Sequence, residues 1–373
     1  MKLIEPILGQ AELDAVAEVL RSGLLTQGPK TQSFETLVKD FTGAQFAHAT
    51  SSATTGLHLA LHALGVGPGD EVIIPDLSFP ATANVVIQLG AIPVLVDIDS
   101  ATYNMSTQLI QDLITARTKA IMPVHAFGLC ADMRSILEIA QKNSLPVVED
   151  AACALGAMIG NTHAGTFGDL GVFSFHPRKV ITTGEGGMVL TDNNILHQTM
   201  QTLRSHGSIR GSHYLEFIDA GYNYRLSDIN SAIGIVQMGR LKEILLKRQE
   251  IASWYNDLFA DLDFIQTPFT PPNYTHSNQS YVLLLDKQIN RNNVIDQLRN
   301  LDIETTLGTY SLHLQPYFKN RFDLSDEIYP NATRAHWSAL TIPVSNNMTF
   351  SDAEFVAESI ISVLNSTISS DSD

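Results

Sequence analysis

The sequence of 373 residues contains few cysteines and little positive charge. Its two cysteines, Cys130 and Cys153, form no C-x-x-C motif, which excludes a disulfide framework and a zinc site built from thiolates. Lys and Arg total 23 against 39 Asp and Glu, so the formal net charge is -16. A protein that binds nucleic acid or an anionic membrane presents a basic face, and we therefore expect neither partner.

Long apolar runs are also absent. No run approaches the length of about 20 residues that spans a bilayer, and the first residues, MKLIEPILGQ, lack the apolar core of a signal peptide. Hydrophobic residues make up 44% of the chain and charged residues 17%, which is typical of a globular protein with a large core. These features predict a cytoplasmic protein with no membrane segment.

Several common catalytic motifs are missing or incomplete. The stretch GLLTQGPKT (23–31) departs from a phosphate-binding P-loop because Pro29 replaces the lysine that follows the second glycine. The stretch HLALH (58–62) has two histidines at i and i+4, but it lacks the glutamate of a zinc-protease helix. There is no G-x-S-x-G, and no G-x-G-x-x-G follows the first expected strands. We expect no metal site.

Apolar strand-like runs alternate with helix-like segments over the first half of the chain. Expected strands lie at 71–75, 91–99, 119–128, 145–152, 170–175 and 186–192, and expected helices at 11–23, 31–43, 54–65 and 132–143. Continuous apolar strands that alternate with helices predict a mainly parallel α/β sheet with helices on both faces.

The composition changes in the last third of the chain. A long helical pattern runs from 226 to 262, and a segment rich in Pro, Asn, Ser and Thr follows at 267–280. We predict a large α/β domain at 1–250, with its first 20 or so residues packed on a small α+β domain at 251–373. The tail, 366–373, is expected to be disordered.

Two features are ambiguous when each is taken alone. In TSSATTGLHLAL (50–61), hydroxyl residues precede a helix, where they form either a plain N-cap or a phosphate seat. In LPVVEDAA (145–152), an apolar strand ends in Glu149 and Asp150, either solvated or facing a cation in the crevice beyond the sheet.

Two further residues have the same ambiguity. Phe79 follows the expected strand at 71–75, where it packs in the core or covers a planar ligand. Lys179, in SFHPRKVITTGEGG (174–187), is a surface lysine or a covalent catalyst. All four features have one common explanation, which is pyridoxal phosphate. The lysine binds it covalently, the carboxylate keeps the pyridine nitrogen protonated, the aromatic ring stacks on it, and the helix N-terminus holds the phosphate.

With these motifs in place, the chain resembles the DegT/DnrJ/EryC1/StrS family of pyridoxal phosphate-dependent sugar aminotransferases, of the aspartate aminotransferase fold type (type I). The resemblance extends over nearly the full length. The segments that carry it are 21–35, 51–61, 76–84, 123–133, 148–157, 165–187, 221–234 and 310–318.

The resemblance implies a role for each matching residue. Lys179 and Asp150 would be catalytic, and Asp150 would face the ring nitrogen. The other implied cofactor contacts are Ser52, Ala53, Thr54 and Ser174 at the phosphate, Phe79 on the ring, Cys153 beside it, and Asn223 at the phosphate of a second subunit. Tyr310 and His313 would lie near the substrate. The implied protein is a homodimer with shared sites that transfers an amino group from an amino acid, glutamate, to a nucleotide-linked keto sugar.

The chain departs from the family pattern at three positions. Ala53 stands where glycine is usual, Cys153 where Gln or His is common, and Arg178 where Thr is common. Alanine does not adopt a positive φ readily, and a thiol is a poor hydrogen-bonding group. Two alternatives stay open, a sugar dehydratase and a non-catalytic, regulatory relative. Dehydratases of the family carry His in place of the lysine, so Lys179 argues against the first, and intact Lys179 and Asp150 argue against the second.

Overall fold

The computed structural model describes residues 1–322 and 324–370. Its main sheet has the strand orders β1-β10-β9-β6 and β4-β2-β5. Bridges between Ile121 and Val147 and between Val124 and Asp150 join the two parts. The strands are β1 (Phe46–Thr50), β2 (Glu71–Pro75), β4 (Ile92–Val96), β5 (Thr118–Ile121), β6 (Val148–Asp150), β9 (Leu170–Ser174) and β10 (Gly187–Thr191).

The expected mainly parallel sheet is confirmed. The pairs β4-β2, β2-β5 and β6-β9 are parallel. Strand β10 is the exception, because it runs antiparallel to both β1 and β9. The carboxyl ends of the other strands therefore meet at one edge of the sheet, where ligands bind in folds of this kind.

Helices cover both faces of this sheet, because side chains alternate along each strand. Val72 and Ile74 belong to the core under α3 (Ala53–Ala63), α4 (Ala81–Gln88) and α7 (Asn194–Leu203). Ile73, between them, packs on the opposite face with α5 (Thr107–Leu113) and α6 (Met133–Asn143). On that face, α2 (Pro29–Thr42) and the start of α8 (Asp228–Leu258) cover β9 and β10, and α1 (Gln10–Ser22) lies against α8.

A second, antiparallel sheet lies toward the C-terminus, in the order β13-β15-β18-β16. Its strands are β13 (Ile265–Gln266), β15 (Tyr281–Leu285), β16 (Thr306–Leu307) and β18 (Ala339–Ile342). It has a separate core with α9 (Arg291–Asn300), α12 (Phe350–Ser370) and the end of α8. Met1 packs against this core, and Val344 donates a backbone hydrogen bond to Leu3. Since α8 passes residue 250 without a break, the domain boundary near that residue stays a prediction.

Helix α12 continues to Ser370, and residues 371–373 lie outside the described residues. The disorder expected for 366–373 stays a prediction. In the described part of the chain, no helix combines the length and apolar character needed to cross a bilayer.

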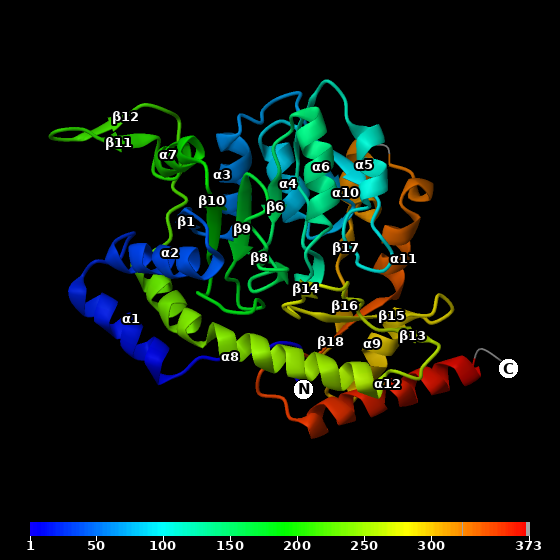
Figure 1. The fold of residues 1–373 in the computed structure, drawn as a ribbon. Helices are drawn as coiled ribbons and strands as arrows, with labels where there is room; N and C mark the ends of the chain where they lie inside the picture. The colour runs from blue at the N-terminus through cyan, green and yellow to red at the C-terminus, as the bar shows by residue number, and fades with distance from the viewer. Residues whose placement is uncertain (323, 371–373) are drawn as a thin grey trace.

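Short elements complete the fold, and two of them matter for the site. Strand β3 (Leu77–Ser78) pairs with β17 (Tyr310–Ser311), and the hairpin of β11 (Ser208–Arg210) and β12 (Leu215–Phe217) projects from the body (Figure 1). The others are β7 (Met158–Ile159), β8 (Thr162–His163), β14 (Tyr274–Thr275), α10 (Pro316–Phe322), α11 (Pro330–Ser338), and the 3-10 turns Ala126–Gly128, Leu312–Leu314 and Asp326–Ile328.

Candidate active site

Lys179 and Cys153 meet at the edge of the main sheet. Lys179 follows β9, Cys153 follows β6, and these strands are parallel neighbours, so both loops leave the sheet on the same side. The Lys179 amine donates a hydrogen bond to the Cys153 sulfur at 3.0 Å. Lys179 is half-buried, whereas Arg178 is exposed. The lysine therefore points into the site and its cationic neighbour points to solvent.

Asp150 ends β6 in the same site and is 5% exposed. One carboxylate oxygen accepts from the Thr82 hydroxyl at 2.8 Å, and the other from the Ala152 backbone N–H at 3.2 Å. Burial raises the pKa of Asp150 above its usual range, while these hydrogen bonds and the charge of Lys179 oppose the rise. The chain compensates this carboxylate only in part, which suits a site that receives a cation.

Glu149, the adjacent residue, shows the opposite arrangement. One oxygen accepts from the N–H groups of Phe167 and Gly168, both at 2.7 Å, and the other accepts from Gly165 N–H at 2.8 Å. The second oxygen is also 2.8 Å from Nε2 of His125, whose Nδ1 accepts from a backbone N–H. This carboxylate is saturated by protein donors, so it fixes the loop before β9 rather than binding a ligand.

The start of α3 has the N-terminal geometry of a phosphate seat, and its role as one stays a prediction. Ser52 is its N-cap and accepts from the N–H of Thr55 at 3.1 Å. The N–H groups of Ala53 and Thr54 have no intrahelical acceptor and carry partial positive charge. Ala53 begins the helix, and no positive φ occurs there, so its methyl group is accommodated without backbone strain.

Strand β10 lies unusually close to this helix start. A Cβ on Gly187 would lie 2.6 Å from the Ala53 nitrogen, so every residue type other than glycine would clash there. Gly187 pairs with Ser174 across the sheet, and this register places the Ser174 hydroxyl near the same seat. Gly187 thus lies against Ser52 and Ala53 and pairs with Ser174, and the roles of these residues at the phosphate stay predictions.

Phe79 and Tyr310 border the site on neighbouring segments. Tyr310 pairs with Ser78, directly before Phe79. In the single chain, 65% of Phe79 is exposed, so its ring is free to cover a planar ligand. Ser78 also hydrogen-bonds to Thr82 at 2.7 Å, which links this segment to Asp150.

His313 does not occupy the place expected for a substrate contact. It is fully buried, its Nδ1 lies 2.7 Å from Asp76, and its Nε2 lies 3.2 Å from the Thr333 hydroxyl. Both ring nitrogens therefore have partners inside the protein. The structure corrects the expectation: His313 anchors the segment that carries Tyr310 to the end of β2.

Asn223 lies on the extended segment between the hairpin and α8, next to Tyr224, whose carbonyl accepts from the Ser51 N–H at 2.8 Å. Asn223 is exposed in the single chain and pairs with Ser205 through a backbone bridge. Its role at the phosphate of a partner subunit therefore stays a prediction.

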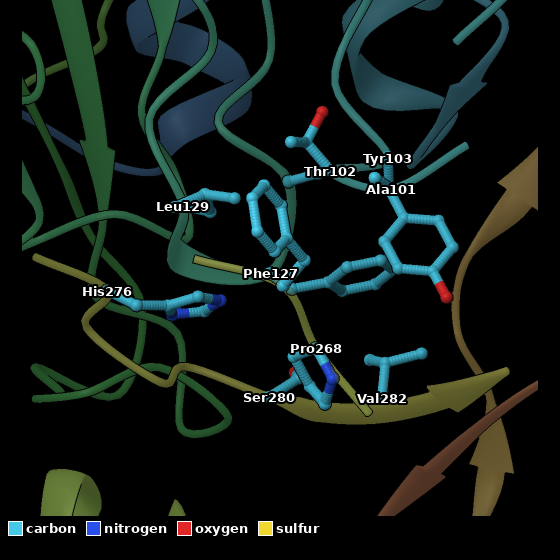
Figure 2. A pocket seen from close by; sticks show the side chains of 11 residues that line it. Ala101, Thr102, Tyr103, Phe127, Leu129, Pro268, His276, Ser280 and Val282 are labelled. Atoms are coloured by element: carbon cyan, nitrogen blue, oxygen red, sulfur yellow. The ribbon is translucent and has the colours of Figure 1, made fainter. Parts of the chain in front are cut away.

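A small cavity elsewhere is not a substrate site. Figure 2 shows it between the rings of Tyr103 and Phe127 and the segment that holds Pro268 and His276. Its volume is about 10 Å³, which is room for about one water molecule. None of the predicted site residues lines it.

The residues at the sheet edge fit pyridoxal phosphate. They offer a lysine amine for the covalent link, a buried carboxylate for the ring nitrogen, an uncovered aromatic ring and a helix N-terminus cleared by Gly187. Among residues 1–322 and 324–370 there is no group of three or more His, Cys, Asp or Glu that could hold a metal ion. Fold and site together define a pyridoxal phosphate-dependent transferase of the aspartate aminotransferase type.

The chain belongs to the DegT/DnrJ/EryC1/StrS aminotransferase family, whose model matches residues 6–361. It is 37% identical over 368 residues to the spore coat polysaccharide biosynthesis protein SpsC of Bacillus subtilis, covering 95% of each chain.

Solved structures agree with this assignment. The putative sugar aminotransferase Spr1654 from Streptococcus pneumoniae, in its PMP form, matches with a TM-score of 0.96 and 27% identity over 100% of both chains. The aminotransferase PseC of Helicobacter pylori, involved in pseudoaminic acid biosynthesis, matches with a TM-score of 0.93 and 29% identity, covering 98% of this chain and 99% of its own. Spr1654 is also known in a PLP form. Pyridoxal phosphate is thus the cofactor, as the sequence predicted.

Sequence reasoning missed Thr82, Ser78 and Gly187. The hydroxyls of Ser78 and Thr82 lie at a strand-to-helix turn, where Ser and Thr are common for local reasons. Only the contact with Asp150, 68 residues away in the chain, distinguishes Thr82 from an ordinary turn residue. Gly187 lies in a Gly-Gly pair, which is visible in the sequence but does not by itself indicate a binding site.

Proposed function

We propose that this enzyme transfers an amino group from L-glutamate to a keto sugar linked to a nucleotide, which yields an amino sugar. The observation that carries the proposal is the placement of Lys179 and the buried Asp150 over adjacent strand ends, beside the helix start at Ser52. Polysaccharide, glycan or secondary-metabolite biosynthesis would use the product. The names of SpsC and PseC, which refer to polysaccharide and pseudoaminic acid biosynthesis, support a sugar substrate.

Each half of the reaction depends on a proton transfer by Lys179. When bound, pyridoxal phosphate supplies an electron sink for the charge that develops at the substrate Cα. Asp150 stabilises the protonated ring nitrogen, since a buried anion opposite a cation is held ionised. The Lys179 amine would hold the cofactor, and as a general acid and base it would move a proton between the amino acid Cα and C4′ of the cofactor. The same transfer in reverse aminates the keto sugar.

The remaining residues bind and orient. The N–H groups of Ala53 and Thr54, with Ser52 and Ser174, hold the phosphate. Phe79 covers the ring, Tyr310 borders the sugar, and the Cys153 sulfur accepts a hydrogen bond from the Lys179 amine.

The functional unit in this proposal is a homodimer with shared sites, located in the cytoplasm, in which Asn223 reaches the phosphate of the partner subunit. Two apolar side chains of the hairpin that precedes Asn223 support a partner surface, since Tyr214 is 73% exposed and Phe217 68% exposed. Monomeric proteins seldom expose such groups together.

A substrate screen tests the proposal. The purified protein is incubated with glutamate and a small panel of nucleotide keto sugars, and mass spectrometry follows 2-oxoglutarate and amino sugar. We expect both products to form in equal amounts with at least one sugar. Conversion of glutamate with no aminated sugar across the panel would exclude the sugar assignment. Loss of water from the sugar without amination would support the dehydratase alternative.

A further inference from the structure

The two histidines of HLALH have no role in the chemistry described so far, yet the structure gives them partners. His58 and His62 lie on one face of α3, because residues at i and i+4 are neighbours on a helix. Nδ1 of His62 lies 2.8 Å from the Tyr222 hydroxyl, and Nδ1 of His58 lies 3.4 Å from the Tyr224 hydroxyl. The helical spacing thus matches two tyrosines from a segment 160 or more residues away.

The two tyrosines form a rigid pair. Their rings are stacked, with centroids 4.6 Å apart and planes 5° from parallel. His58 presents its edge to both rings, at 5.1 Å from Tyr222 and 5.8 Å from Tyr224. Burial lowers the pKa of His58 and raises the pKa of both tyrosines. Protonated phenols and a neutral imidazole are the forms in which the hydroxyls donate to Nδ1.

The backbone of this segment is extended and held on both sides. Tyr222 and Tyr224 donate their N–H groups to Leu203 and Arg204, and Tyr224 accepts from Ser51 at 2.8 Å. In an extended chain, alternate side chains point to opposite sides. Because both tyrosines point to α3, Asn223 between them points away from it, and it is exposed.

Helix α3 therefore contacts two functional elements. Its N-terminus is the phosphate seat of its own subunit, and the face two turns along holds the segment that carries Asn223. We propose that His58, His62, Tyr222 and Tyr224 form a clamp that positions Asn223 for the cofactor phosphate of the partner subunit. This inference rests on the shared site of the proposed function. The four residues are positioning residues, since they act through Asn223.

The first test removes both hydroxyls and keeps the rings. The double variant Tyr222→Phe/Tyr224→Phe retains the stack but loses both bonds to α3. In titrations of the cofactor-free dimer followed by absorbance, we expect pyridoxal phosphate to bind roughly 3- to 10-fold more weakly. The single variant Tyr222→Phe, which loses the shorter bond, provides a milder case if the double variant is poorly folded.

Matched controls come from the second core. Tyr255 donates to the Pro343 carbonyl at 2.9 Å, and Tyr281 donates to Asn256 at 2.7 Å. Tyr255→Phe and Tyr281→Phe each remove one phenol hydrogen bond far from Asn223, and we expect less than about 2-fold change in cofactor affinity. Equal weakening in controls and clamp variants would show a general loss of stability and overturn the proposal.

A double-mutant cycle separates positioning from stability. In an Asn223→Ala background, the two Tyr→Phe changes should weaken cofactor binding no further, because the group they position is gone. Full additional weakening in that background would show that the tyrosines do not act through Asn223.

Hybrid dimers decide which site the clamp serves. A Lys179→Ala chain paired with an Asn223→Ala chain contains one complete site, to which the Lys179→Ala chain contributes Asn223. The Tyr→Phe changes should weaken cofactor binding at that site when they are on the Lys179→Ala chain and not when they are on the other. If hybrids without these changes show no recovered site, the shared site itself is wrong, and the clamp with it. Recovery that is insensitive to the position of the changes would overturn the clamp alone.

Discussion

Two regions of this chain differ in how far contacts within a single chain satisfy their side chains. The strand-end site, formed by Thr82, Asp150, Cys153 and Lys179, is buried or half-buried, and every member contacts another through protein hydrogen bonds. The hairpin segment, residues 208–225, includes the hairpin of β11 and β12, which projects from the body in Figure 1. Its side chains Tyr214, Leu215 and Phe217 are exposed. This difference indicates that one chain alone organises the strand-end site, whereas the hairpin segment requires a second surface.

Mutations in the two regions should affect different chains of a dimer. A change in the strand-end site should act on the same chain that carries it. A change in the hairpin segment should act on the neighbouring chain. The activity of mixed dimers therefore tests whether the two regions differ in this way.

The largest effect is expected from Lys179→Ala. It removes both the covalent link and the proton-transfer group, so turnover should fall by roughly 10³-fold or more. Borohydride reduction of the native enzyme should attach the cofactor to the peptide that contains Lys179. A label on another lysine would contradict the assignment.

Asp150→Asn is expected to lower turnover by on the order of 10²-fold, because the charge that stabilises the ring nitrogen is lost while the side-chain shape is kept. Steady-state kinetics at saturating cofactor measures this. Near-normal turnover with bound cofactor would show that another residue holds the nitrogen.

The same variant should be more stable than the native protein when both are free of cofactor. Burial raises the pKa of Asp150, so its ionised form is less favourable in the folded than in the unfolded chain. That penalty is present at neutral pH and disappears as the pH falls through the raised pKa. We expect Asp150→Asn to melt about 2 °C or more above the native apoprotein at pH 7, and the difference to shrink in acid. A lower melting temperature at pH 7 would contradict this reading.

Asn223→Ala is expected to reduce activity at least tenfold, about 1.4 kcal/mol. Co-expression with Lys179→Ala protein should then recover activity well above the sum of the parents, because one site of the hybrid has both residues. Verified hybrids without recovery would place Asn223 outside the partner's site and remove the distinction between the two regions.

The smallest effect is expected from Thr82→Val, which keeps the shape of the side chain and removes the hydroxyl that donates to Asp150. We expect kcat to fall roughly 3- to 10-fold, as for the loss of one hydrogen bond to a charged group. Ser78→Ala, one bond further from Asp150, serves as the control and should change kcat less.

Much of the fold was predictable because apolar periodicity reports local structure directly. The expected strand at 71–75 is β2, the expected helix at 132–143 is α6 within one residue, and the long helical pattern after 226 is α8. The reversed direction of β10 was not predictable, since strand direction depends on the path of the connections and leaves no trace in the apolar pattern.

For the site, the sequence by itself determined which residue types were available: a lysine after one strand, two carboxylates after another, hydroxyls before a helix. Only the tertiary structure decided their roles. Glu149 and Asp150 are adjacent, and alternation along β6 sends them to opposite sides. Glu149 accepts from four protein donors, whereas Asp150 faces Lys179. His313 was equally plausible as a ligand until its two nitrogens were found bonded inside the protein. Such assignments depend on partners tens to hundreds of residues away, which local sequence does not encode.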